Sequence, residues 1–81
     1  MPKFRKKPLL EIEWIDASHY SGWKDAKDCK KDSPVTTRTV GFKVPSRRDC
    51  IVLAMTHNEY DDVSGREVIP RKLIKSIRRI E

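Results

Sequence analysis

The sequence predicts a mainly β fold: a small five-stranded, strongly bent β-barrel with one short helix in the excursion after the first strand. Short apolar runs rich in β-branched residues recur along the 81 residues, with Gly, Pro, Ser or Asp between them. A long polar stretch, residues 16–33, follows the first run, and a single Pro-bounded turn precedes the last. Five short strands with this spacing are typical of a small bent barrel.

The first strand is expected at residues 9–15. Apolar and acidic residues alternate there with the period of two that is typical of a half-buried strand. The residues expected to face the core are Leu10, Ile12 and Trp14, and those expected to face water are Glu11 and Glu13.

Residues 16–33 are expected to leave the sheet. The Ser-Gly pair at 21–22 breaks the chain, and residues 23–31 are compatible with about two helical turns that end before a Ser-Pro pair. Because this helix is largely polar, we expect Trp23 and Ala26 to hold it, with Trp23 packed on the barrel as a lid.

A hairpin is expected next, between strands at residues 35–44 and 50–56. The second of these is the most apolar run, so we expect it to be central and covered on both faces. Gly41 marks either a bend or a place where another backbone or a ring lies close. The residues of the first strand expected on its buried face are Val40, Phe42 and Val44.

The rest of the chain predicts two more strands. After the polar acidic loop of residues 57–65, a short strand at residues 66–70 ends at a proline. Residues 71–81 are compatible with an amphipathic helix, or with one 3₁₀ turn at residues 71–73 followed by a final strand. We favour the turn and strand, because four strands leave an edge that needs a partner.

Composition and charge narrow the class of protein. We expect a basic flexible arm at residues 1–8 and a single domain at residues 9–81. The net charge of +6 favours an anionic partner. Surface Lys and Arg that only keep the protein soluble explain this charge equally well. No apolar run reaches about 20 residues, so we expect no membrane span and a cytoplasmic location. A thin core also favours a homo-oligomer.

Candidate catalytic and metal-binding residues form no convincing set. Asp16, Ser18 and His19 are near neighbours on one turn, whereas a nucleophile, its base and an orienting group converge from separate elements. Cys29 and Cys50 are expected to be reduced thiols, and no C-x-x-C or H-x-x-x-H pair anchors a zinc site. We therefore expect no enzyme, no cofactor and no metal.

Aromatic and basic residues indicate a binding site instead. If the two long excursions meet at one end of the barrel, their rings form a rim that suits a planar base, with nearby cations for its phosphate. The candidate ligand-binding residues are His19, Tyr20, Trp23, His57, Tyr60, Arg38, Arg71 and Lys72. The basic cluster at residues 71–79 has a second interpretation, in which its charges keep an Ile-rich edge strand from pairing with other chains.

Several short blocks resemble known proteins. Residues 68–77, a Pro-ended strand, a turn and an Ile-rich strand, resemble the closing segment of Sm-like and Src-homology-type barrels. Small proteins encoded by phages and prophages are similar in three blocks: Trp-Ile-Asp-Ala at 14–17 with Gly-Trp at 22–23, Thr-Val-Gly-Phe-Lys-Val at 39–44 with Ile-Val-Leu-Ala at 51–54, and residues 69–77. This resemblance implies a cytoplasmic protein of an infected or lysogenic bacterial host, and it supplies no catalytic residues.

The leading hypothesis is a non-enzymatic, oligomeric module that holds a phosphate-bearing nucleotide in a pocket at a subunit boundary. The phage resemblance implies its purpose, the sequestration of a nucleotide immune signal made by the host. The alternatives are an Sm-like barrel that binds RNA or DNA, and a protein-interaction module that inhibits a host complex. Salt dependence separates the three, because polyanion binding weakens most steeply with salt.

Overall fold

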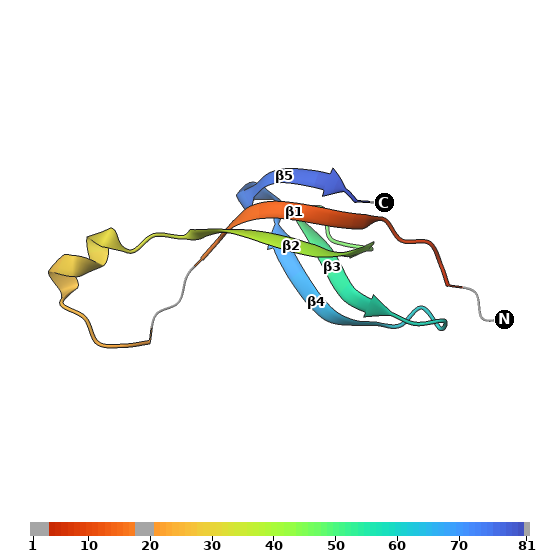
Figure 1. The fold of residues 1–81 in the computed structure, drawn as a ribbon, viewed down its shortest axis with the longest axis horizontal. Helices are drawn as coiled ribbons and strands as arrows, with labels where there is room; N and C mark the ends of the chain where they lie inside the picture. Colours follow the sequence, from red (N-terminus) through yellow and green to blue (C-terminus); the bar gives the residue numbers. More distant parts are fainter. Residues whose placement is uncertain (1–3, 18–20, 81) are drawn as a thin grey trace.

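The computed structural model describes residues 4–17 and 21–80, which form five antiparallel strands in one sheet (Figure 1). The elements, with η for a 3₁₀ helix, are β1 (Leu9–Asp16), η1 (Ala26–Lys31), β2 (Val35–Val44), β3 (Cys50–His57), β4 (Val63–Pro70), η2 (Arg71–Leu73) and β5 (Ile74–Arg79). The mainly β prediction is therefore confirmed. Among the described residues, no helix is both long and apolar enough to cross a membrane.

The sheet is not closed into a barrel. Its strand order is β4-β3-β2-β1-β5, so β4 and β5 are the two edges, and η2 joins one edge to the other. β5 pairs with β1, with Ile77 opposite Ile12. The 3₁₀ turn and final strand predicted after Pro70 are confirmed, and the amphipathic helix is wrong.

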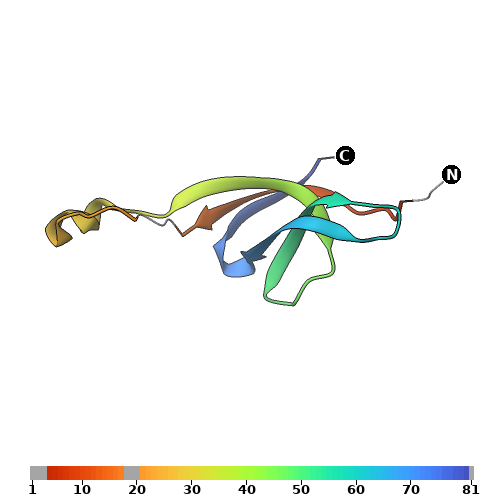
Figure 2. The same ribbon diagram turned by 90° about the horizontal axis from the view of Figure 1, so that it is seen from below.

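β2 connects two parts of this sheet. Residues 35–42 of β2 pair with β1, whereas residues 42–44 pair with β3. The sheet thus consists of two ribbons, β2-β1-β5 and β3-β4, which meet at three residue pairs. Figure 2 shows β2 curving over towards the β3-β4 ribbon, so the inner faces of the two ribbons turn towards each other.

The core lies between these inner faces. Its buried residues are Leu10, Ile12, Trp14, Ile51, Leu53 and Ile69, with Leu73 and Ile74 packed against them. Each fully buried Ile or Leu side chain stabilises the fold by about 1.5–3 kcal/mol. The Trp14 indole N–H donates a hydrogen bond to Thr39 Oγ1 at 3.0 Å, so its buried polar atom is satisfied. The core-facing residues predicted for β1 are confirmed.

The prediction for the buried face of β2 is wrong at two of its three residues. Val40 is 52 % exposed, Phe42 is half-buried, and Val44 alone of the three is buried. The register gives the reason: Gly41 pairs with Leu10 and shares its inner face, so the alternate residues of β2 lie on the outer face.

β3 lies between β2 and β4, and both of its faces are covered over its first half. Ile51 and Leu53 face the core, and the neighbouring Cys50 and Ala54 are buried as well. The predicted coverage of both faces is thus confirmed in part, because Val52 is half-buried and Met55 is exposed.

Gly41 lies where the second ribbon comes closest to the first. A Cβ atom at this position would lie 2.9 Å from the Ala54 carbonyl oxygen and 3.0 Å from Leu53 Cβ. The prediction that another backbone lies close to Gly41 is confirmed. A side chain here would push β2 and β3 apart at the point where the two ribbons join.

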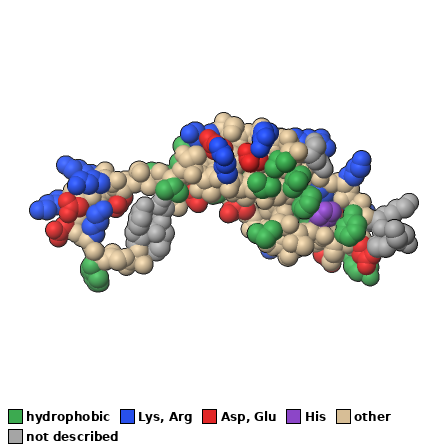
Figure 3. All heavy atoms as spheres, viewed as in Figure 1, with side chains coloured by type: hydrophobic (Ala, Val, Ile, Leu, Met, Phe, Trp, Pro, Cys, Tyr) green, Lys and Arg blue, Asp and Glu red, His purple; other side chains and the backbone are tan. Residues whose placement is uncertain are grey.

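Residues 21–34, which we call the finger, project from the sheet at the β1–β2 end (Figures 1 and 2). η1 in the finger buries no residue, and Trp23 is fully exposed at 105 %. Lys24 pairs with Asp32 at 2.9 Å, and Figure 3 shows lysine and aspartate side chains gathered over this part of the chain. The predicted lid is wrong, because the finger has too few apolar residues to bury against the sheet.

Gly41→Ala should destabilise the protein by about 1–3 kcal/mol, because the added methyl forces the β2 and β3 backbones apart. Gly22→Ala is the matched control, since no atom of the described residues lies within 4 Å of a Cβ at that position. It should change stability by less than about 0.5 kcal/mol. Chemical denaturation measures both variants. Equal stability of the two variants would contradict the close approach at Gly41.

Candidate functional site

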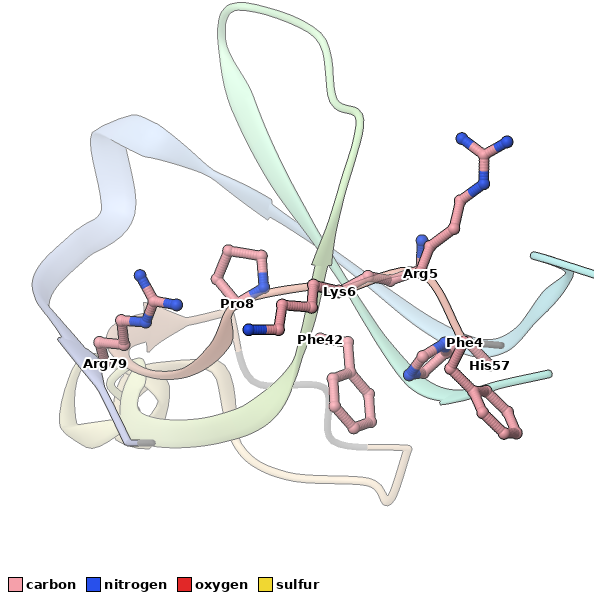
Figure 4. A pocket seen from close by; sticks show the side chains of 8 residues that line it. Phe4, Arg5, Lys6, Pro8, Phe42, His57 and Arg79 are labelled. Carbon is pink, nitrogen blue, oxygen red and sulfur yellow. The ribbon is translucent and has the colours of Figure 1, made fainter. Parts of the chain in front are cut away.

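A groove of about 670 Å³ lies beside the segment that leads into β1 (Figure 4). Its lining residues are Phe4, Arg5, Lys6, Lys7, Pro8, Phe42, His57 and Arg79. They come from four places in the sequence: the segment before β1, a position near the end of β2, and the last residues of β3 and β5. The groove therefore combines basic side chains with aromatic rings.

The walls of the groove follow from the strand register. Phe42 belongs to both ladders of β2, so it lies where the two ribbons join. The Lys43 N–H donates to the Pro8 carbonyl at 2.9 Å and holds the segment before β1 along β2. Arg79 pairs with Leu10, which brings the end of β5 to the start of β1.

The basic residues of the groove differ in exposure and direction. The Lys7 side chain is only 10 % exposed, whereas that of Arg5 is 79 % exposed. In Figure 4 the Lys6 side chain extends towards Arg79, and Arg5 points away from the rings. Lys7 Nζ donates a hydrogen bond to the Asp61 carboxylate, and Arg5 Nε lies 3.8 Å from the same group.

Asp61 is held in position by the β3–β4 loop. Asn58 Oδ1 accepts hydrogen bonds from the backbone N–H groups of Tyr60 and Asp62, each at 3.0 Å. The Asp61 N–H donates to the Asn58 carbonyl at 3.0 Å. The φ angle of Asp61 is +66°, in the left-handed region that Asp and Asn tolerate better than most residues. This turn directs the Asp61 carboxylate towards Lys7.

His57 lies between two phenyl rings. Its ring centroid is 4.6 Å from that of Phe42 and 5.7 Å from that of Phe4, and both contacts are edge-to-face. Its Nδ1 atom is buried and has no hydrogen-bond partner among the described residues. A buried nitrogen without a partner costs free energy, so the packing of the rings around His57 must offset the cost.

The ion pairs of Asp61 change its acidity. The hydrogen bond from Lys7 lowers the pKa of the Asp61 carboxyl below the ordinary 3.8. Desolvation raises this pKa, and the positive charges of Lys7 and Arg5 lower it further. Asp61 is therefore charged throughout the physiological range and holds the segment before β1 on the loop.

Of the residues predicted to bind the ligand, His57 lines the groove. Tyr60 lies nearby in the β3–β4 loop and is 78 % exposed, whereas Trp23 lies on the finger. His19 and Tyr20 fall outside the described residues. Figures 1 and 2 place the finger and the β3–β4 loop at opposite ends of the molecule, so the described parts of the two excursions do not form one rim.

The predicted basic residues are also dispersed. Arg38 lies on β2 and pairs with Glu13 at 3.3 Å. Arg71 Nε donates to the Arg48 carbonyl at 2.9 Å, which fastens η2 to the β2–β3 loop. Lys72 is exposed in η2, at the opposite end of β5 from Arg79. Elsewhere in the predicted cluster, Lys75 and Arg78 pair with glutamates of β1.

Sequence reasoning missed the part of the site that precedes β1. The charge of residues 1–8 was the available signal, but nothing in the sequence places that segment beside His57. In the structure residues 4–8 of this segment contact β2 and the β3–β4 loop. Phe42 was assigned to the core because of its alternation, so its outward direction was missed as well.

The free energy of unfolding at acid pH should depend on the charge of Asp61. The pKa of Asp61 is lower in the folded state than in the unfolded state, so its charge stabilises the fold. This contribution to the free energy of unfolding is fully present above the unfolded pKa of 3.8 and is lost as pH falls through the lowered folded value. The difference in unfolding free energy between wild type and Asp61→Asn should therefore shrink as pH falls from about 5. Asp62→Asn keeps the Lys7 pair and should follow the wild type. A difference that does not vary with pH would contradict the pairing.

Comparison of the chain with protein-family models, with curated proteins and with solved structures found no match. The resemblance to Sm-like barrels and to phage proteins therefore stays a prediction. The groove brings four basic side chains, two phenyl rings and an imidazole ring together in one place.

Proposed function

We propose that this protein is a non-enzymatic binding module that holds a small phosphate-bearing nucleotide in the groove. The observation that carries the proposal is the meeting of Lys6, Lys7 and Arg79 with the rings of Phe42 and His57. Cations suit a phosphate and rings suit a base. The described lining residues contain no pair of nucleophile and base, which supports binding without catalysis.

The cations favour a ligand with concentrated negative charge. Arg79 has the planar guanidinium that binds phosphate oxygens at two points, and Lys6 and Lys7 supply compact charges. Because Lys7 is largely shielded from water, its interaction with a phosphate is screened less than that of an exposed lysine. Such a ligand would lie along the segment before β1.

The rings favour a ligand with a planar group. Phe42 and His57 already contact each other edge-to-face, and a base that lies against either ring gains stacking energy of about 1–3 kcal/mol. A nucleotide can contact both the basic side chains and the rings of the groove, whereas inorganic phosphate can contact only the basic side chains.

The size of the groove supports a small ligand. Its volume of about 670 Å³ lies within the range of roughly 300–1,000 Å³ that is usual for small-molecule sites. A single-stranded nucleic acid is the second candidate, because Phe4 is 58 % exposed and the Arg5 side chain 79 % exposed at the rim, where a longer strand could continue. Steep salt dependence would favour this second candidate.

The proposal also includes self-association and a biological purpose. The open edges β4 and β5 and the exposed Val68 support a homo-oligomer, and the strand order is compatible with the bent Sm-like barrel predicted from the sequence. The resemblance to phage proteins supports sequestration of a host nucleotide signal as the purpose of binding.

The test is calorimetric titration of the protein with ADP. Lys6→Gln should weaken binding about tenfold, because one charge-assisted contact to phosphate is lost. Lys72→Gln is the matched control, since it removes the same charge from η2, and it should change the affinity less than about twofold. No binding of ADP by the wild type, or equal losses in the two variants, would contradict the proposed site.

A further inference from the structure

We propose that the Asp61 carboxylate is an internal competitor for the anionic ligand: it occupies Lys7 and Arg5 in the free protein, and a bound phosphate displaces it. The inference rests on the proposed function, because it concerns the same groove. It assigns to Asp61, which does not line the groove itself, the role of lowering the affinity of the basic lining residues for the charge of the ligand.

The Lys7 ammonium connects the groove with Asp61. Lys7 lines the groove, yet its side chain is only 10 % exposed and its Nζ donates to the Asp61 carboxylate. A shielded ammonium needs an anion or an acceptor beside it, and Asp61 supplies one in the free protein. A phosphate that reaches Lys7 from the groove brings a second negative charge to the same ammonium. The two anions repel each other unless the carboxylate moves away.

The Asp61 carboxylate is able to move. Its side chain is 38 % exposed, so it can turn into water without being buried elsewhere. Its second partner, Arg5, is 79 % exposed and 3.8 Å away, a contact of the kind that contributes little. The backbone of the loop does not depend on the carboxylate, because Asn58 Oδ1 holds the turn through the N–H groups of Tyr60 and Asp62.

A purely structural role of Asp61 predicts the opposite result. In that case Asp61 fastens the segment before β1, and its loss would open the groove and weaken ligand binding. The segment has other attachments, however: the Lys43 N–H donates to the Pro8 carbonyl at 2.9 Å, and Phe4 contacts His57. We therefore expect the groove to persist without the Asp61 charge, with Lys7 free to meet the ligand.

The experiment compares wild type, Asp61→Asn and Asp62→Asn by calorimetric titration with inorganic pyrophosphate, with ADP and with adenosine. Asn suits the left-handed φ of +66° at position 61, so this variant keeps the turn. Asp62→Asn removes the same charge from the next residue and serves as the control for long-range attraction. Circular dichroism checks that both variants fold.

We expect Asp61→Asn to bind pyrophosphate and ADP about three- to tenfold more tightly than wild type, with a change below about twofold for Asp62→Asn. Adenosine, which carries no phosphate, should bind all three proteins equally. Equal affinities of the two variants for pyrophosphate, or weaker binding by Asp61→Asn, would overturn this inference alone. Failure of ADP to bind any of the three proteins would overturn the proposed function, and the inference with it.

Discussion

The close approach of the β3 backbone to Gly41 is the contact on which the rest of the structure depends. β2 can pair with β1 along most of its length and still reach β3, because Gly41 has no Cβ to occupy the space next to Ala54. The two ribbons then turn their inner faces towards each other and enclose Ile12, Ile51 and Ile69. Without that approach the sheet would be flatter, and a single layer of strands could not cover its own apolar face.

The groove is a consequence of the same junction. Phe42 follows Gly41 directly and points to the opposite face of β2, so the bend that encloses the core also carries a ring to the surface. β3 diverges from β2 after Ala54, and His57 at its end meets Phe42 from the side. The basic segment before β1 then closes one wall through its bond to Lys43. Core and candidate site therefore share a few adjacent residues of one strand.

The predictions from sequence succeeded where local pattern decides the outcome. The alternation at Leu10, Ile12 and Trp14 identified the core face of β1, and Pro70 marked the turn before β5. Predictions that depended on how distant segments meet did not succeed. Val40, Phe42 and Val44 alternate on one face of β2, so the sequence favours that face as the inner one. The pairing of Gly41 with Leu10 places it on the outer side instead. Likewise, the sequence does not indicate that the two long excursions lie at opposite ends, or that Lys7 meets Asp61.

The pairing of β5 with β1 has a consequence for the order of folding. Ile12 lies opposite Ile77, so β1 acquires its second neighbour only when β5, which lies far later in the chain, is available. The β3-β4 hairpin, in contrast, joins segments that are close in sequence and can form early. β1 therefore keeps one edge unpaired until β5 is present to pair with it. The alternating glutamates of that strand pair with Arg38 and Arg78 in the folded protein. Before β5 is in place, their charges disfavour pairing of the free edge with other chains.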